Sequence, residues 1–176
     1  MHETDIASFV GSISVGTFVV GLTDVIICSP DLKIVATSGR KETLDLALSE
    51  NIIDEGCYEV GETFSKCDYI FLCAPVSFNA KYLADLKPII KTDCIITDVG
   101  STKTDIHTRV SELDMESNFI GGHPMAGSEK TGLDNSKRHL IENAYYVVTP
   151  TSKVSTEAVE DYVEFIGSLK ALPLVL

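Results

Sequence analysis

Residues 94–120, CIITDVGSTKTDIHTRVSELDMESNFI, contain the pattern that decides the fold. The stretch begins with an apolar run at 94–98 and ends with a second one at 118–120, both of strand length. Between them, residues 103–113 carry apolar side chains at spacings of four and three, the period of an amphipathic helix. A strand, a helix and a strand in this order predict two parallel strands of one sheet, because the helix returns the chain to the edge where the first strand began.

The same alternation extends in both directions from this stretch. Strand-length apolar runs recur at 6–10, 33–37, 69–74, 144–149 and 172–176, and helical spacing recurs at 41–49 and 156–169. Nearly continuous apolar strands separated by helices are typical of a sheet that is covered on both faces. The sequence therefore predicts an α/β fold with a doubly wound, mostly parallel, Rossmann-like sheet in a single domain over residues 1–176.

The composition excludes several classes of partner. Lys and Arg number 14 against 26 Asp and Glu, and this net charge of -12 disfavours nucleic acid and anionic membranes. The longest apolar stretch, 18–28, is interrupted by polar residues and is too short to span a bilayer. The first residues lack the basic start of a secretory signal, so we expect a cytoplasmic protein. The 5 cysteines have no metal-ligand spacing, which predicts reduced thiols and no metal site.

Polar residues and glycines that could bind a ligand or take part in a reaction follow the predicted strands. In sheets of this class ligands bind beyond the carboxyl ends of the strands. The residues expected there are Gly11, residues 38–40, Pro75, Ser101 and His123. His123 lies in a glycine-rich turn, GGHPMAGSEK at 121–130, where backbone can approach a ligand closely. We therefore expect the active site at this edge.

Three motifs follow one another along the chain: DYIFLCAPV at 68–76, DVGSTK at 98–103, and GHPMAGSE at 122–129 followed by ENA at 142–144. In this order they resemble the motifs of the prephenate/arogenate dehydrogenases, which perform the oxidative step towards tyrosine. The resemblance extends from Lys33 to the end of the chain. It implies oxidative decarboxylation of prephenate to 4-hydroxyphenylpyruvate with hydride transfer to NAD(P).

The resemblance also implies roles for individual side chains. His123 would accept the proton of the ring hydroxyl, which a neutral imidazole can do at physiological pH. Ser101 would hydrogen-bond His123 and the substrate hydroxyl, although its position also suits a helix N-cap. Ser128 and Glu129 would line the substrate cavity. Lys103 would steer the anionic substrate, or is an ordinary solvated residue of the first helical turn.

The expected dinucleotide loop departs from its usual pattern. A dinucleotide fold carries Gly-x-Gly-x-x-Gly after its first strand, whereas residues 11–16 read GSISVG. Gly11 and Gly16 match the pattern, but Ile13 replaces the glycine that lets backbone approach the pyrophosphate. Either the loop takes another path, with Ser12 and neighbouring hydroxyls donating to phosphate, or cofactor binding is weakened or lost. A third alternative is that the two glycines serve only the turn and helix packing.

The end of the second predicted strand bears on the choice of cofactor. An NAD-preferring site places an acid there to hold the ribose hydroxyls. This chain instead has Thr37, Ser38 and Arg40, which suit the 2′-phosphate of NADP better, so NADP is favoured over NAD. The alternative is that Arg40 belongs to a solvated helix start. The resemblance places Ala74 and Pro75 along the bound dinucleotide.

The predicted function is thus a prephenate dehydrogenase-like oxidoreductase acting on a small-molecule substrate. The alternatives are an arogenate dehydrogenase, or a catalytically silent module that binds a nucleotide or a partner protein. Members of the family continue into a helical domain that makes the dimer and grips the substrate carboxylates, and no such segment is present here. We therefore expect slight or no turnover by this chain alone, and a homodimer only if that domain is supplied.

Overall fold

The structure, a computed structural model, describes residues 24–28, 33–39, 41–51, 53–74, 76–126 and 141–176. The predicted strand at 6–10 and loop at 11–16 lie outside the described residues. In chain order the elements are β1 (Asp24–Cys28), β2 (Lys33–Thr37), α2 (Lys41–Ser49), β3 (Glu55–Cys57), η1 (Glu62–Lys66), β4 (Tyr69–Leu72), α3 (Val76–Leu86), β5 (Ile95–Asp98), α4 (Thr104–Glu112), η2 (Glu116–Asn118), β6 (Phe119–Pro124), β7 (Tyr145–Pro150), α5 (Thr156–Ser168) and β8 (Leu172–Val175).

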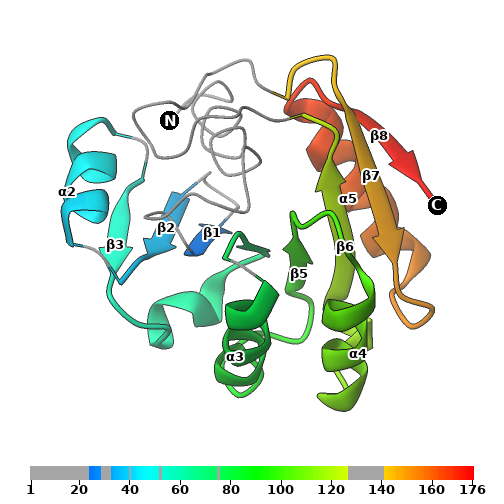
Figure 1. Cartoon of the computed structure of the whole chain (residues 1–176), viewed down its shortest axis with the longest axis horizontal. Coiled ribbons are helices and arrows are strands. Elements are labelled where there is room, and N and C mark those ends of the chain that lie inside the picture. Colours follow the sequence, from blue (N-terminus) through cyan, green and yellow to red (C-terminus); the bar gives the residue numbers. More distant parts are fainter. Residues whose placement is uncertain (1–23, 29–32, 40, 52, 75, 127–140) are drawn as a thin grey trace.

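The described strands form one sheet in the order β3-β2-β1-β4-β5-β6-β7-β8 (Figure 1). Strands β4, β5 and β6 are parallel neighbours, as are the pairs β2-β3 and β7-β8. Strand β1 is antiparallel to β2 and β4, and β7 is antiparallel to β6. Strands β2, β4, β5 and β6 therefore all end at one edge of the sheet, called here the carboxyl edge. The predicted α/β, Rossmann-like class with mostly parallel pairing is confirmed.

Strand β1 was not predicted as a separate element. It takes the position between β2 and β4 that a Rossmann-like sheet gives to its first strand. Only residues 29–32 separate β1 from β2, which is enough for a hairpin but not for the crossover that a parallel neighbour requires. In this hairpin Asp24 pairs with Thr37 at the carboxyl edge, and Cys28 pairs with Lys33 at the opposite edge. The chain therefore leaves β1 on the side away from the candidate site.

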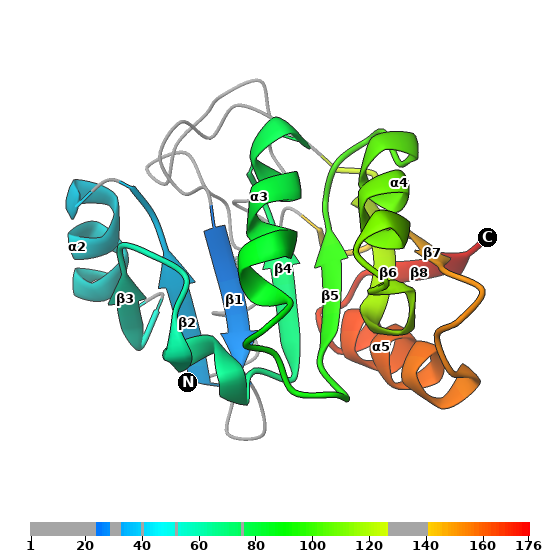
Figure 2. The ribbon, with the colours of Figure 1, turned by 90° about the horizontal axis from the view of Figure 1, so that it is seen from below.

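Helices cover both faces of the sheet, as expected of a doubly wound fold. Helices α2 and α5 pack on one face, where Leu44 and Ile166 join a buried cluster. Helices α3 and α4 pack on the other, where Leu83 and Val110 join a second cluster (Figure 2). Among the described residues, no helix has the length and apolar character needed to cross a membrane. Burial of these two apolar layers is the main stabilising contribution to the fold.

The described cysteines are not all reduced. Cys57, Cys73 and Cys94 are free thiols, whereas Cys67 is disulfide-bonded. The expectation of reduced thiols is therefore wrong for Cys67. Burial raises the pKa of Cys94 to about 12, so this thiol stays protonated and unreactive at neutral pH.

Candidate functional site

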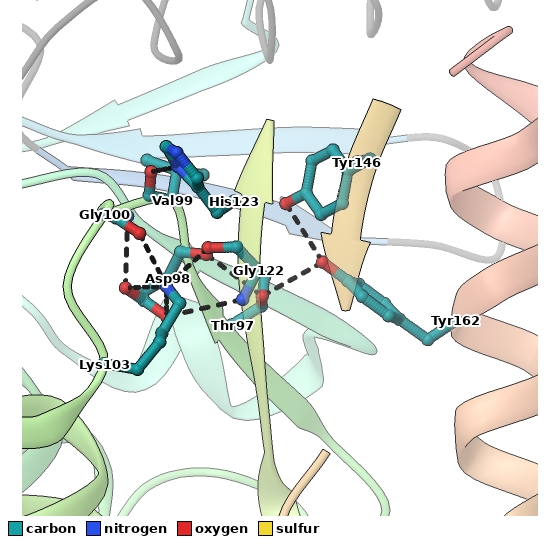
Figure 3. Close-up of polar contacts among 9 residues, drawn as sticks. All are labelled: Thr97, Asp98, Val99, Gly100, Lys103, Gly122, His123, Tyr146 and Tyr162. Carbon is teal, nitrogen blue, oxygen red and sulfur yellow. Dashed lines mark hydrogen bonds and ion pairs between the residues drawn. The ribbon is translucent and has the colours of Figure 1, made fainter. Parts of the chain in front are cut away.

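A buried ion pair between Asp98 and Lys103 underlies the candidate site at the carboxyl edge. Asp98 ends β5 with its side chain 1% exposed, and Lys103 directly precedes α4. The Lys103 Nζ atom lies 2.7 and 2.6 Å from the two carboxylate oxygens (Figure 3). The backbone N–H groups of Gly100 and Gly122 donate to the same carboxylate over 3.1 and 3.4 Å. These donors favour the ionised carboxylate.

Burial and attraction act in opposite directions on this pair. Burial raises the pKa of Asp98 and lowers the pKa of Lys103, while the attraction between the two groups opposes both changes. With the hydrogen bonds to Asp98 added, we take the pair to be charged at neutral pH. A pair of this kind is costly to break from one side, because the remaining charge stays buried without a partner.

Lys103 joins three segments of the chain. Besides Asp98, its Nζ atom donates to the carbonyl of Gly100 at 2.7 Å and to the carbonyl of Gly122 at 2.6 Å. An ammonium group has three N–H donors, and all of them have acceptors within the protein. Lys103 is thus not a solvated first-turn residue, because its ammonium ties the end of β5 and the following turn to β6.

His123 lies near the end of β6, half-buried, and on the face of the sheet that carries Asp98. Its Nδ1 atom is 3.4 Å from the carbonyl oxygen of Val99 (Figure 3). Because a carbonyl can only accept, this contact requires the proton on Nδ1 and leaves Nε2 as the acceptor. Such a tautomer can take a proton from a ligand hydroxyl at Nε2.

Gly121 and Gly122 allow β6 to lie close to its neighbours at this point. A Cβ on Gly122 would lie 2.6 Å from the Tyr146 hydroxyl and 2.7 Å from the Asp98 carbonyl. A Cβ on Gly121 would lie 3.0 Å from the His107 Nε2 atom. Any side chain at either position would push β6 away from the neighbouring strands, so the double glycine is a packing requirement for placing His123.

Ser101 lies exposed in the turn between β5 and α4. The sequence allowed two roles for it, a helix N-cap and a contact to the histidine and substrate. Helix α4 begins at Thr104 with Lys103 as its N-cap residue and no side-chain capping bond. Ser101 therefore does not cap α4, and its hydroxyl lies in the exposed turn at the carboxyl edge.

The end of β2 differs from what the cofactor prediction requires. Thr37 and Ser38 are 2% and 0% exposed, so the two predicted phosphate donors are buried. The next residue, Gly39, is exposed, and a Cβ there would meet no atom of the described residues within 4 Å. Ala74, which follows β4, is half-buried at the same edge.

The remaining predicted site residues lie outside the described residues; they are Gly11, Ser12, Ile13, Gly16, Arg40, Pro75, Ser128 and Glu129. The structure brings His123, Ser101 and Lys103 together around the ends of β5 and β6. Thr37, Ser38 and Ala74 lie farther along the same edge, at the ends of β2 and β4. Sequence reasoning gave no role to Asp98, although a carboxylate that ends an apolar strand five residues before a lysine could have indicated a buried pair.

A cavity of about 530 Å³ lies away from this site. It is found at the start of β4 and β5, beside the first turn of α5, at the edge opposite His123. Four of the residues that line it are acidic, namely Asp68, Asp93, Glu157 and Asp161. Acidic walls repel phosphates and carboxylates, so this cavity does not suit a dinucleotide or an anionic substrate.

His107 is a second histidine near the site, on the inner side of α4. Among the described residues, its buried Nε2 atom has no hydrogen-bond partner, and neither has the buried Oγ1 atom of Thr149. Burial lowers the pKa of His107, while Asp98 raises it and Lys103 lowers it further. The ring packs edge-on against Phe119 with centroids 5.4 Å apart. His107 thus fills space between α4 and β6 as a neutral ring.

The His107→Asn variant is expected to unfold with a weaker dependence on acid than the parent chain. In the unfolded chain a histidine takes up its proton as the pH falls below about 6.5, whereas folded His107 resists protonation. The stability that neutral His107 contributes is therefore complete above that pH and declines as the pH falls further. Urea unfolding at several pH values measures this difference, and identical pH profiles for the two chains would contradict it.

Comparison with known proteins identifies the family of this chain. The sequence model of the family described as prephenate dehydrogenase, nucleotide-binding domain, matches residues 28–173. The chain belongs to the prephenate dehydrogenase family. It is 37% identical over 127 residues to the prephenate dehydrogenase of Lactococcus lactis subsp. cremoris, covering 70% of this chain and 35% of that protein.

Two crystal structures from the family share the architecture. Synechocystis arogenate dehydrogenase has a TM-score of 0.76 at 30% identity, covering 82% of this chain and 51% of that one. Prephenate dehydrogenase from A. aeolicus, in complex with hydroxyphenyl propionate and NAD+, has a TM-score of 0.78 at 24% identity, covering 99% of this chain and 55% of that one. The chain thus spans about half of these structures and about a third of the Lactococcus lactis protein.

Proposed function

We propose that this member of the prephenate dehydrogenase family supplies the cofactor site and catalytic histidine for oxidative decarboxylation of prephenate to 4-hydroxyphenylpyruvate. The observation that carries the proposal is the placement of His123. Its Nδ1 atom faces the carbonyl of Val99, so that Nε2 can act as the acceptor at the carboxyl edge. The A. aeolicus relative binds a phenol-bearing ligand and NAD+ together, which fits a site that handles a ring hydroxyl beside a nicotinamide.

In this proposal His123 is the general base. A bound NAD(P)+ would supply the acceptor for the hydride lost from the carbon that carries the ring hydroxyl. As that hydroxyl becomes a carbonyl, Nε2 of His123 takes its proton. When the ring carboxylate leaves as CO2, its bonding electron pair makes the ring aromatic, and the former carbonyl oxygen takes the proton back from His123 to give the phenol. The hydrogen bond from Nδ1 to Val99 fixes the required tautomer, and the Asp98–Lys103 pair holds the backbone on both sides of that contact.

The other substrate contacts are assigned by the resemblance together with position. Ser101, exposed in the turn after β5, hydrogen-bonds the ring hydroxyl and His123. The resemblance assigns Ser128 and Glu129 to the lining of the substrate cavity. We assign Lys103 to positioning Gly122 and His123, because its ammonium is already bonded to protein acceptors and its charge is balanced by Asp98.

The dinucleotide would lie along the carboxyl edge, with Ala74, Pro75 and the exposed Gly39 beside it. Gly11, Ser12, Ile13 and Gly16 would meet the pyrophosphate. Of the residues proposed to select NADP, Arg40 carries the preference, since Thr37 and Ser38 are buried. NAD is the competing cofactor, and it is the one bound in the A. aeolicus relative.

Calorimetric titration of the chain with NADP+ and, separately, with NAD+ tests the cofactor proposal. We expect tighter binding of NADP+, and we expect Arg40→Asp to weaken NADP+ binding by about tenfold or more, as loss of a charge-assisted phosphate contact should. Lys41→Asp is the matched control, because Lys41 begins α2 next in sequence and pairs with Asp45 instead. Equal losses for both cofactors, or no loss, would contradict the role of Arg40.

Failure to bind either cofactor would favour the second candidate, a silent module that binds a partner protein. Ile13 in the dinucleotide loop and the hairpin direction of β1 are the observations that favour it. Arogenate remains the alternative substrate, as in the Synechocystis relative. Because the matched relatives are longer, we further propose that strong turnover and a homodimer require the helical half of the protein.

A further inference from the structure

A chain of hydroxyl groups lies on the face of the sheet opposite the Asp98–Lys103 pair. Tyr146 on β7 and Tyr162 on α5 have their hydroxyl oxygens 3.2 Å apart. The Tyr162 hydroxyl is also 3.0 Å from the Oγ1 atom of Thr97 on β5, which lies 3.3 Å from the carbonyl of Asp98 (Figure 3). Thr97 is fully buried, as are both tyrosines. None of these residues was singled out from the sequence.

The Asp98 carbonyl, at one end of this row of hydroxyl groups, fixes the direction of the hydrogen bonds between them. The Asp98 carbonyl can only accept, so Thr97 donates to it and must accept from Tyr162. Tyr162 in turn accepts from Tyr146. Burial raises the pKa of both tyrosines, which therefore remain protonated donors at neutral pH.

Both ends of the hydroxyl chain meet the backbone that carries the proposed catalytic groups. The Tyr146 hydroxyl is 2.6 Å, and Thr97 Oγ1 is 2.9 Å, from the point where a Gly122 Cβ would lie. On the opposite face, the N–H and C=O groups of Gly122 bond to Asp98 and Lys103. Gly122 is thus packed from one face of the sheet and hydrogen-bonded from the other, directly before His123.

We propose that Thr97, Tyr146 and Tyr162 are positioning residues for His123, because their hydroxyl chain braces Gly122 against the end of β5. The proposal rests on the proposed function only in treating the orientation of His123 as catalytically important. Without the Tyr146 hydroxyl, a space opens beside Gly122 and the backbone can relax towards it. The contact between His123 Nδ1 and Val99, already 3.4 Å long, then weakens, and the imidazole loses its fixed tautomer.

The test compares ring nitrogen shifts of His123 by NMR in the parent chain and in Tyr146→Phe, Tyr162→Phe and Thr97→Val. Spectra are recorded at a pH where imidazole is neutral, and the His123 signal is assigned by its absence in His123→Asn. Tyr145→Phe is the matched control, since Tyr145 is the preceding residue of β7, is 60% exposed and faces the other side of the sheet. We expect the parent and Tyr145→Phe chains to hold mainly the Nδ1-protonated tautomer, and the three core variants to shift towards a mixture.

Unchanged tautomer ratios in Tyr146→Phe and Thr97→Val, with cooperative thermal unfolding retained, would overturn the proposal. An equal shift in Tyr145→Phe would also overturn it, because the effect would then not depend on the hydroxyl chain. Thr97→Val keeps the shape of the side chain and so remains informative if a tyrosine variant folds poorly. The measurement needs no substrate; turnover retained in His123→Asn would refute the proposed function while leaving this result intact.

Discussion

Substitution of His123 by asparagine is expected to lower the rate of prephenate oxidation by about 10²- to 10⁴-fold, the usual contribution of a positioned general base. Asparagine keeps a polar side chain of similar reach but cannot take the proton of the ring hydroxyl. The affinity for NAD(P)+ should stay nearly unchanged, because the proposed cofactor contacts lie at β2, β4 and the preceding loop. Formation of reduced nicotinamide with the chain in excess over prephenate measures the rate, and calorimetry measures the affinity.

His107→Asn is the control for this experiment, because it makes the same replacement at a histidine directed into the protein. Its Nε2 atom is buried and has no hydrogen-bond partner in the described part of the chain, so we expect the rate to remain that of the parent chain. A His123→Asn chain that retains the parent rate would end the assignment of His123 as the base. A parent chain that binds NAD(P)+ but oxidises no prephenate even when the helical half is supplied would instead favour the silent module.

The sequence predicts the parallel part of the fold well because its signals are local. The period and length of the apolar pattern predict the strands at 69–74 and 94–98 and the helix at 103–113. Elements β4, β5 and α4 fall inside these ranges. Helix α3 was not predicted. Asn79 occupies a buried position on it, 2% exposed, and a polar residue there interrupts the apolar stripe that periodicity detects.

Strand direction is harder to predict when several apolar segments compete for one place. Residues 6–10 and 24–28 are both of strand length, and nothing in their period distinguishes them. The structure gives the central place to β1, where pairing with β2 and β4 decides the direction. Such pairing is a tertiary property that local propensity does not contain.

The motifs made His123, Ser101 and Lys103 candidate site residues, and their roles remain predictions. For Lys103 the sequence allowed either steering of an anionic substrate or a solvated position in the first helical turn, and its carboxylate partner Asp98 received no role. Spacing alone does not indicate whether a lysine after a turn points outward or folds back onto a strand end. The tyrosine hydroxyls come from β7 and α5, far along the sequence from Thr97, so only the fold brings them together.

Lys103→Met is expected to lower the free energy of unfolding by about 3–5 kcal/mol, as measured by urea denaturation. Methionine keeps much of the length of the side chain but leaves the Asp98 carboxylate buried and without its cation. The carbonyls of Gly100 and Gly122 lose their donor as well. Since domains of this size are stable by only about 5–15 kcal/mol, this single change removes a large part of the total.

The dependence of this loss on pH identifies its cause. Without Lys103 the pKa of Asp98 rises further, because burial is then opposed by less attraction. A folded-state pKa above the unfolded value means that folding is penalised where Asp98 is ionised, so the deficit should shrink as the pH falls towards the acid range. A deficit that grows on acidification would contradict a buried unpaired carboxylate.

Two further variants distinguish the effect of breaking the ion pair from general damage to the core. Asp98→Asn combined with Lys103→Met should be more stable than Lys103→Met alone, since no buried charge remains, although the carbonyl of Gly122 still lacks its donor. Lys41→Met is the surface control; it breaks an exposed pair with Asp45 on α2 and should change stability little. If the double variant is no more stable than Lys103→Met, the lysine stabilises the fold chiefly through its hydrogen bonds to the carbonyls of Gly100 and Gly122. The loss of these bonds, rather than the unpaired charge of Asp98, then accounts for the lower stability of Lys103→Met.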